Sequence, residues 1–245
     1  MGLGCQAVRC GWNPLACTVN QTGAVIYFCE RFSRCVEAMI LTASEVNELK
    51  HAPAVEGVLP TVHQRWSARS YAGREVSKAD LVRVFEAARW AASANNEQPW
   101  RFLVGSRNSL THEKIASALA GLNKEWAPTA PVLILGMANT RFERSGKPNS
   151  YALYDLGAAS SYLTLEAAAL GLVSHQMAGF DHEAMRQLFD IPTDYALGCV
   201  IALGYQREPA ALGNEQLIAR EHAPRERKPL SGLVLSSWGE PAELS

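Results

Sequence analysis

The segment Ser93–Phe102 (SANNEQPWRF) connects a predicted helix to a predicted strand. Upstream, Ser77 and Asp80 predict a capping box, an N-cap hydroxyl followed by an acid three residues later. Apolar residues then recur at helical spacing at Leu81, Val84, Phe85, Ala88 and Ala92. Downstream, Trp100–Gly105 predicts a short strand. Asparagine and glutamine can simply cap a helix end, but a Gln-Pro-Trp string directly before a strand is unusual.

The remaining elements follow from periodicity, and Pro131–Met137 (PVLILGM) is the clearest of them. It is too uniformly apolar for a half-exposed strand and predicts a central one. We expect further strands over residues 172–177 and 196–204, and helices over 109–119, 149–170 and 181–189. The helix over 149–170 carries small residues on several faces, which indicates close packing in the core or at a subunit interface. Gly171 is expected to end it as a C-cap glycine.

The two ends of the chain differ from its middle. Residues 1–38 show no useful helical or strand periodicity, and we assign residues 1–55 to a disordered extension and residues 56–245 to a single domain. Met39 opens ordinary sequence, so it is either the biological start or a residue that follows a genuine tail. Residues 205–245 are rich in Pro, Arg and Glu, with little apolar periodicity before Leu230, and are expected to wrap a neighbour.

The composition argues against several classes of function. The 245 residues are 48% hydrophobic and 19% charged, with a formal net charge of −1. This charge does not favour nucleic acid or an anionic membrane, and no apolar run reaches the roughly 20 residues that span a bilayer. The six cysteines form no C-x-x-C pair and lie beside no histidine cluster, so a metal site is not expected. Without a signal peptide or a disulfide framework, the pattern indicates reduced cysteines and a cytoplasmic protein.

The sequence contains no recognisable group of catalytic side chains. No G-x-S-x-G, H-E-x-x-H, Walker A or G-x-G-x-x-G motif appears, and the histidines are scattered singly. A globular protein of this kind either binds a ligand or borrows its chemistry from a cofactor. Two arginine groups suit an anion: Arg65-x-Ser67-x-Arg69, and Arg225-x-Arg227 far along the chain. Guanidiniums beside a hydroxyl can chelate a phosphate or the polar edge of a heterocycle, although each group alone is more often a solvated basic turn.

The chain resembles the nitroreductase family in the order and spacing of five motifs: Arg65-x-Ser67-x-Arg69, Ser93-x-x-Asn96-x-Gln98-Pro99-Trp100, Asp155-x-Gly157-Ala158-Ala159, Gly179-Phe180-Asp181 and Arg225-x-Arg227. The resemblance covers roughly residues 60–235. It implies an α+β three-layer fold in which helices flank a central mixed or antiparallel sheet. It further implies a homodimer whose C-terminal arms wrap the partner, non-covalently bound FMN, and NADH or NADPH as co-substrate.

The resemblance also implies an FMN site at the dimer interface. Arg65 and Arg227, with Arg225, would hold the phosphate. Ser67 and Arg69 would contact the phosphate or the N1/O2 edge of the ring, where negative charge grows on reduction. A guanidinium at that edge raises the flavin's reduction potential.

Other residues would complete the site by the same resemblance. Trp66 stands where many members carry a small residue or a histidine, and would contribute its backbone. Ser93 and Asn96 would come from the partner subunit. The stretch near flavin N5 would be Met177, Ala178 and Gly179, and Asn123 is the candidate for a further ring-edge ligand.

The implied reaction needs no catalytic side chain, which agrees with the missing catalytic group. FMN would accept hydride at N5 from NAD(P)H and pass electrons to a small electrophilic acceptor, such as a nitroaromatic or a quinone, in a ping-pong cycle. One alternative is other flavin chemistry on the same scaffold: enone reduction, dehalogenation or flavin destruction. The lid that would separate these is expected around residues 121–126 and 142–149. Another alternative is a non-enzymatic FMN-binding module.

Overall fold

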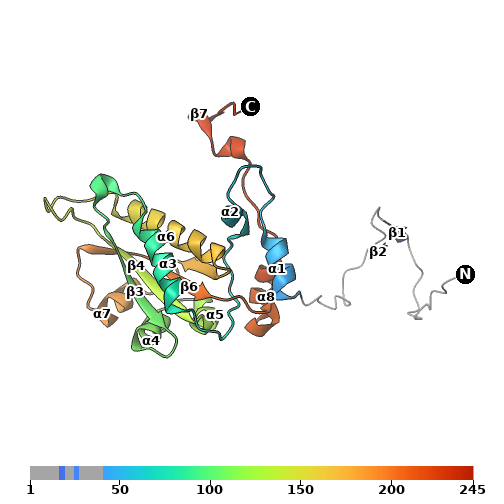
Figure 1. Ribbon diagram of the computed structural model, residues 1–245, viewed down its shortest axis with the longest axis horizontal. Helices are drawn as coiled ribbons and strands as arrows, with labels where there is room; N and C mark the ends of the chain where they lie inside the picture. Colours follow the sequence, from blue (N-terminus) through green and yellow to red (C-terminus); the bar gives the residue numbers. More distant parts are fainter. Residues whose placement is uncertain (1–16, 20–24, 28–40, 245) are drawn as a thin grey trace, which may run out of the picture. The chain divides into compact units, whose positions relative to one another are not determined.

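The computed structural model describes residues 17–19, 25–27 and 41–244, and its contacts divide the chain into a unit of residues 1–39 and a unit of residues 40–245 (Figure 1). In the first unit, β1 (Cys17–Val19) pairs antiparallel with β2 (Val25–Tyr27). The expectation of disorder over residues 1–38 otherwise falls outside the described residues. All further elements belong to the second unit.

The centre of the second unit is a four-stranded sheet in the order β3-β4-β6-β5, with every neighbouring pair antiparallel. Its strands are β3 (Trp100–Ser106), β4 (Val132–Asn139), β5 (Val173–Met177) and β6 (Tyr195–Gly204). β4 pairs on both sides, and its residues from Val132 to Ala138 are all buried. The prediction of a central strand from PVLILGM is therefore confirmed.

Helices cover both faces of this sheet. Alternate residues of β4 point to opposite faces, so Leu133 and Leu135 enter one core and Val132 and Ile134 enter the other. The first core is closed by α4 (Leu110–Ser117), α5 (Asn123–Trp126) and α7 (His182–Leu188). The second is closed by α3 (Lys78–Arg89) and α6 (Ala152–Ala169) (Figure 1). The result is the expected three-layer α+β fold.

The helices begin and end where the local sequence predicts. The side chain of Ser77 accepts a hydrogen bond from the backbone of Asp80 at the start of α3, and Asp181 accepts one from Ala184 at the start of α7. Gly171 follows α6 with a φ of 71°, a left-handed conformation that glycine adopts without strain.

One helix lies before residue 56, the expected start of the domain, and a second helix lies just after it. Helix α1 (Ala43–Lys50) begins at a capping box between Thr42 and Glu45, and its Val46 is fully buried against Trp66 and Ala68. Helix α2 (Pro60–Gln64) leads into the arginine segment. Assigning residues 1–55 to a disordered extension is thus wrong for residues 43–50, which form part of the folded unit.

The C-terminal segment contains a helix that its composition did not predict. After η3 (Pro209–Leu212), Asn214 caps α8 (Glu215–His222), whose Leu217 and Glu221 are buried. Beyond α8 come η4 (Leu230–Gly232) and the short pair β7 (Leu235–Ser237) and β8 (Glu240–Pro241), with exposed apolar side chains. In Figure 1 this last stretch extends away from the sheet.

Candidate functional site

The segment Arg65–Ser70 is extended, and alternation sorts its side chains. Trp66, Ala68 and Ser70 are buried, whereas Arg65, Ser67 and Arg69 are partly exposed. Because successive side chains of extended backbone point in opposite directions, Arg65, Ser67 and Arg69 share one face. The indole of Trp66 packs beside α1, where its Nε1 donates to Oδ1 of Asn47 at 2.8 Å. Only the backbone of Trp66 can therefore serve a ligand on the arginine face.

The two arginine groups meet in one cleft of about 320 Å³. The cleft is lined by Lys50, Arg65, Trp66, Ser67, Arg69, Arg220, Ala223, Pro224, Arg225 and Arg227. Arg225 closes it by donating from Nη1 to the carbonyl of Arg65 at 2.6 Å and from Nη2 to the carbonyl of His63 at 2.7 Å. Arg225 therefore fastens the backbone that presents Arg65.

The cleft holds cations against one another. Burial and then the charge of Arg227 lower the pKa of Arg65, and burial followed by Arg65 and Arg227 lowers the pKa of Arg225. Within the described residues, no carboxylate lies within salt-bridge distance of these three guanidiniums. Like charges held together without an acid fit a bound dianion such as a terminal phosphate, which would satisfy several donors at once.

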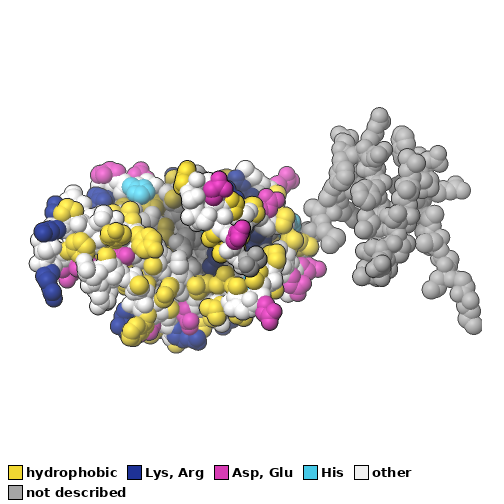
Figure 2. All heavy atoms as spheres, turned by 90° about the horizontal axis from the view of Figure 1, so that it is seen from above, with side chains coloured by type: hydrophobic (Ala, Val, Ile, Leu, Met, Phe, Trp, Pro, Cys, Tyr) yellow, Lys and Arg dark blue, Asp and Glu magenta, His cyan; other side chains and the backbone are white. Residues whose placement is uncertain are grey.

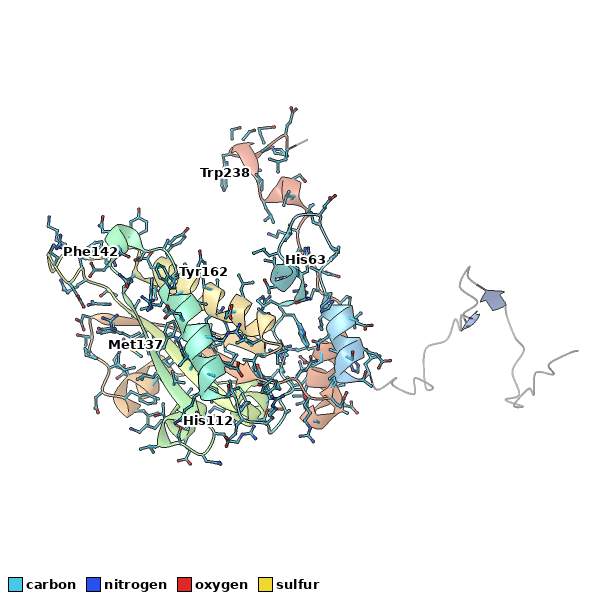
Figure 3. All side chains as sticks on the ribbon, viewed as in Figure 1. His63, His112, Met137, Phe142, Tyr162 and Trp238 are labelled. Carbon is cyan, nitrogen blue, oxygen red and sulfur yellow. The ribbon has the colours of Figure 1, made fainter. Side chains whose placement is uncertain are left out.

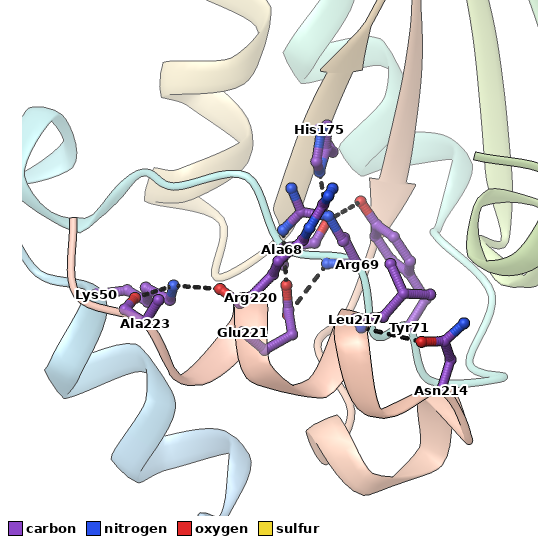
Figure 4. Close-up of polar contacts among 10 residues, drawn as sticks. All are labelled: Lys50, Ala68, Arg69, Tyr71, His175, Asn214, Leu217, Arg220, Glu221 and Ala223. Atoms are coloured by element: carbon purple, nitrogen blue, oxygen red, sulfur yellow. Dashed lines mark hydrogen bonds and ion pairs between the residues drawn. The ribbon is translucent and has the colours of Figure 1, made fainter. Parts of the chain in front are cut away.

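Arg69 differs from the other arginines that line the cleft because it has an acidic partner, which the sequence did not predict. Glu221 of α8 is fully buried and accepts from the backbone N–H of Arg69 at 3.2 Å and from its Nη1 at 3.1 Å (Figure 4). Burial raises the pKa of Glu221, and the hydrogen bonds and charge of Arg69 oppose the rise. Lys50, also missed from sequence, donates to the carbonyls of Arg220 and Ala223 at the end of α8.

Local sequence did contain signals for both missed residues. The Thr42–Glu45 capping box marks the helix that carries Lys50. Asn214, with Glu215 in the first turn and basic residues in the last, marks the helix that carries Glu221. Neither signal indicates that the two helices end at the same arginine cleft.

A second cleft of about 410 Å³ shares Arg65 and Ser67 with the first and is lined further by Val62, Ser161, Thr164, Leu165 and Gln176. Beside it, His175 on β5 lies with Nδ1 3.1 Å from the carbonyl of Ala68, and its ring packs against Trp126 at 4.7 Å between centroids. Burial, followed by the charge of Arg69, lowers the pKa of His175 to about 4. His175 is therefore neutral at pH 7 and donates to the arginine segment.

Past β5 the chain exposes backbone. The side chain of Met177 is buried in the core, whereas Ala178 and Gly179 are exposed. Asn123 donates from Nδ2 to the carbonyl of Gly179 at 3.1 Å. A Cβ on residue 179 would lie 2.8 Å from that Nδ2, so glycine lets the two segments approach. The structure thus brings Asn123 and residues 177–179 together, while their role toward FMN stays a prediction.

Ser93 and Asn96 lie in a separate, tightly held loop. The Oγ of Ser93 accepts from the N–H of Gln98 at 3.0 Å, and buried Asp155 accepts from the N–H of Ala94 at 3.1 Å. Asn95, Asn96 and Gln98 have φ values of 53°, 56° and 50°, which are unusual outside glycine. This loop does not line the arginine cleft. It borders a groove formed with residues 142–147.

The loop and the arginine cleft lie at opposite ends of the described unit. Figure 3 shows Phe142, which borders the loop's groove, far from His63, whose carbonyl Arg225 binds. One chain therefore does not unite the predicted site. The exposed Tyr162 of α6 lies in the region between them (Figure 3). Gly157 on this helix has open space around its Cβ position.

The surface around α6 is rich in apolar side chains. Leu153, Tyr154 and Tyr162 of this helix are exposed, as is its N-cap residue Tyr151. Figure 2 shows hydrophobic side chains spread over much of the face seen there. Among the described residues, no helix is both long enough and apolar enough to cross a membrane.

Comparisons with known proteins identify the family that this chain resembles. The model of the nitroreductase family matches residues 62–205. An uncharacterized 15.4 kDa protein of Mycolicibacterium smegmatis is 37% identical over 150 residues, which cover 58% of this chain and 99% of the relative. An NADH dehydrogenase of Thermus thermophilus is 29% identical over 201 residues, covering 70% of this chain and 92% of that protein. A crystal structure described as an oxidoreductase containing FMN is 28% identical, with a TM-score of 0.72, and the match covers 78% of this chain and 96% of that one.

Proposed function

The chain belongs to the nitroreductase family, and from this premise we propose that it is an FMN-dependent oxidoreductase. It would carry reducing equivalents from NADH or NADPH to a small electrophilic acceptor such as a nitroaromatic or a quinone. The observation that carries the proposal is the cleft in which Arg65, Arg225 and Arg227 face one another without an acid among the described residues. The names of the Thermus relative and of the FMN-containing structure support the same activity.

The residues present suit FMN. Arg65 and Arg227 would bind the phosphate, and Arg225 would hold Arg65 in place through its carbonyl. Ser67 and Arg69 point from the same face and would bind the phosphate or the N1/O2 edge of the ring. The adjoining cleft beside Gln176 and the exposed backbone of Ala178 and Gly179 would receive the ring, with Asn123 alongside.

Bound FMN supplies two-electron redox chemistry, accepting hydride from a reduced nicotinamide and giving electrons to an acceptor. The side chains of this protein bind, orient and tune it. His175, neutral at pH 7 because its pKa is about 4, fixes the arginine segment through Ala68 and would not act as an acid. The arginine side chains and the exposed backbone of Ala178 and Gly179 would bind and orient the cofactor without a catalytic side chain.

A homodimer completes the proposal. Ser93 and Asn96 would join the arginine cleft of a second copy, since the two half-sites of one chain lie apart. The exposed aromatic and small residues of α6 offer an interface that allows close approach, and the apolar arm after α8 offers a segment to wrap the partner.

The test is the absorbance spectrum of the purified protein, followed by anaerobic titration with NADH and with NADPH. We expect a yellow protein that releases FMN rather than FAD on heating, because the cleft suits a terminal phosphate. Addition of reduced nicotinamide should bleach the flavin band. A colourless protein that FMN does not stabilise contradicts the proposal, and FMN that resists bleaching by both nicotinamides indicates a binding module instead.

A further inference from the structure

Glu221 is a fully buried carboxylate to which the proposed chemistry assigns no task. Both of its oxygens accept from one residue, Oε2 from the backbone N–H of Arg69 and Oε1 from its Nη1. The side chain of Arg69 remains 20% exposed and lines the arginine cleft. A guanidinium carries five N–H donors in a rigid fork, so an acid on one side still leaves donors for a ligand.

The buried position of Glu221 is not explained by folding stability. Burying an ion pair is seldom a net gain in stability, because both charges lose their water. Six cations line the cleft: Lys50, Arg65, Arg69, Arg220, Arg225 and Arg227. Among the described residues, the pair of Arg69 with Glu221 is the only salt bridge that any of them forms. Of the six, Arg69 is thus the cation that a carboxylate of the described chain both orients and partly neutralises.

We infer that Glu221 is a positioning residue of the flavin site, which aims Arg69 at the cofactor and offsets part of its charge. The inference rests on the proposed function. Reduced FMN carries more negative charge at its N1/O2 edge than oxidised FMN does, so a guanidinium there stabilises the reduced form. A carboxylate paired with that guanidinium weakens the effect. Glu221 therefore keeps the reduction potential of bound FMN below the value that a lone Arg69 would set.

The test compares Glu221→Gln with Arg69→Ala, because a charge effect gives them opposite signs. Glutamine keeps the shape and one oxygen acceptor for Arg69 but removes the charge. We expect Glu221→Gln to shift the ratio of the dissociation constants for oxidised and reduced FMN roughly tenfold towards the reduced form, about 30 mV upward in potential. Arg69→Ala should shift the potential downward. The readouts are FMN affinity by fluorescence titration and the midpoint potential by spectroelectrochemistry.

The control is Glu226→Gln, an equal change of charge at an exposed position beside Arg225 and Arg227. Its potential should match the unaltered protein because solvent screens the lost charge. The double variant Arg69→Ala/Glu221→Gln covers the case in which the single variant does not fold. Its potential should equal that of Arg69→Ala, since a buried carboxyl without its guanidinium takes up a proton.

The outcomes separate the inference from the function on which it rests. If the unaltered protein binds no FMN, the proposed function fails before the inference is tested. If it binds FMN but Glu221→Gln lowers the potential as Arg69→Ala does, Glu221 only braces the fold. If Glu221→Gln behaves like Glu226→Gln, or if the double variant lies well above Arg69→Ala, Glu221 does not act through Arg69. Each of the last three results, all measured on protein that binds FMN, overturns the inference.

Discussion

The arginine cleft and the loop around residues 93–98 are both motif-bearing regions, but they are built in opposite ways. The cleft gathers charges from three distant parts of the chain and holds them with hydrogen bonds that cross up to 173 residues, as between Lys50 and Ala223. The loop is shaped mainly from within: Ser93 binds Gln98 five residues away, and three non-glycine residues adopt positive φ. Long-range contacts therefore assemble the cleft, whereas hydrogen bonds within the loop set its shape and the distant Asp155 anchors it.

The difference shows how one short chain can carry two halves of a site. Asn95 and Asn96 are exposed, and the loop does not line the arginine cleft of its own chain. Backbone strain of this kind persists where surrounding structure enforces it and is typical of functional sites. The proposed second copy would receive it. The comparison can be tested by disturbing each region separately.

Acid should affect the cleft through His175. The unfolded pKa is about 6.5, and the folded pKa is about 4. Above pH 6.5 the imidazole is neutral in both states; between pH 6.5 and 4 only the unfolded state binds the proton, so stability falls with pH. The loss from this group approaches about 3 kcal/mol at pH 4 and then levels off.

The measurement is urea unfolding at pH 7 and at pH 4.5, for the unaltered protein and for His175→Asn. Asparagine can still donate to the carbonyl of Ala68 but does not titrate, so the variant should lose less stability on acidification. Equal losses in both proteins would show that His175 is not the group responsible.

Removing a side chain that would donate hydrogen bonds to the FMN phosphate should weaken FMN binding. The expected loss of binding free energy is equal to or smaller than the loss of folding stability at His175. Arg227→Ala deletes one charge-assisted contact, which is about 1.5–3 kcal/mol, or roughly ten- to hundredfold in the dissociation constant. Fluorescence titration of the apoprotein with FMN measures it. Lys228→Ala is the matched control, since that lysine is exposed and does not line the cleft. A similar loss in both variants would mean that only the general field of the surface matters.

The smallest single effect is expected at the loop. Asn96→Ala should remove the neutral hydrogen bond proposed between Asn96 and the FMN bound in the partner's cleft, which would weaken FMN binding by about 0.5–1.5 kcal/mol. The sharper use of this variant is to mix it with Arg227→Ala and let the subunits exchange. A hybrid dimer then has one site with both residues intact, so about a quarter of all sites should regain full FMN affinity. Mixing Arg227→Ala with itself is the control. No recovery after verified exchange would place both half-sites within one chain.

Periodicity and capping residues determined the framework of this protein from the sequence alone. The run over residues 131–137 predicted the doubly paired strand, and Ser77, Asp181 and Gly171 marked helix ends that the structure shows. These features succeed because helix caps and the alternation of side chains along a strand depend on neighbours within a few residues. The motif order was likewise sufficient to identify the nitroreductase family, which the family comparison confirms.

Tertiary structure alone decided which charges face each other. Helices α1 and α8 have eight residues each, which is too short for a helix to be stable without packing. Their local sequence patterns were therefore too weak to predict them. The motifs predicted no acidic partner for Arg69 and only a backbone contribution from Trp66. Folding pairs Arg69 with Glu221, 152 positions away, and packs the indole of Trp66 beside α1. A charge acquires its partner from whatever the fold packs beside it, and no local pattern encodes that choice.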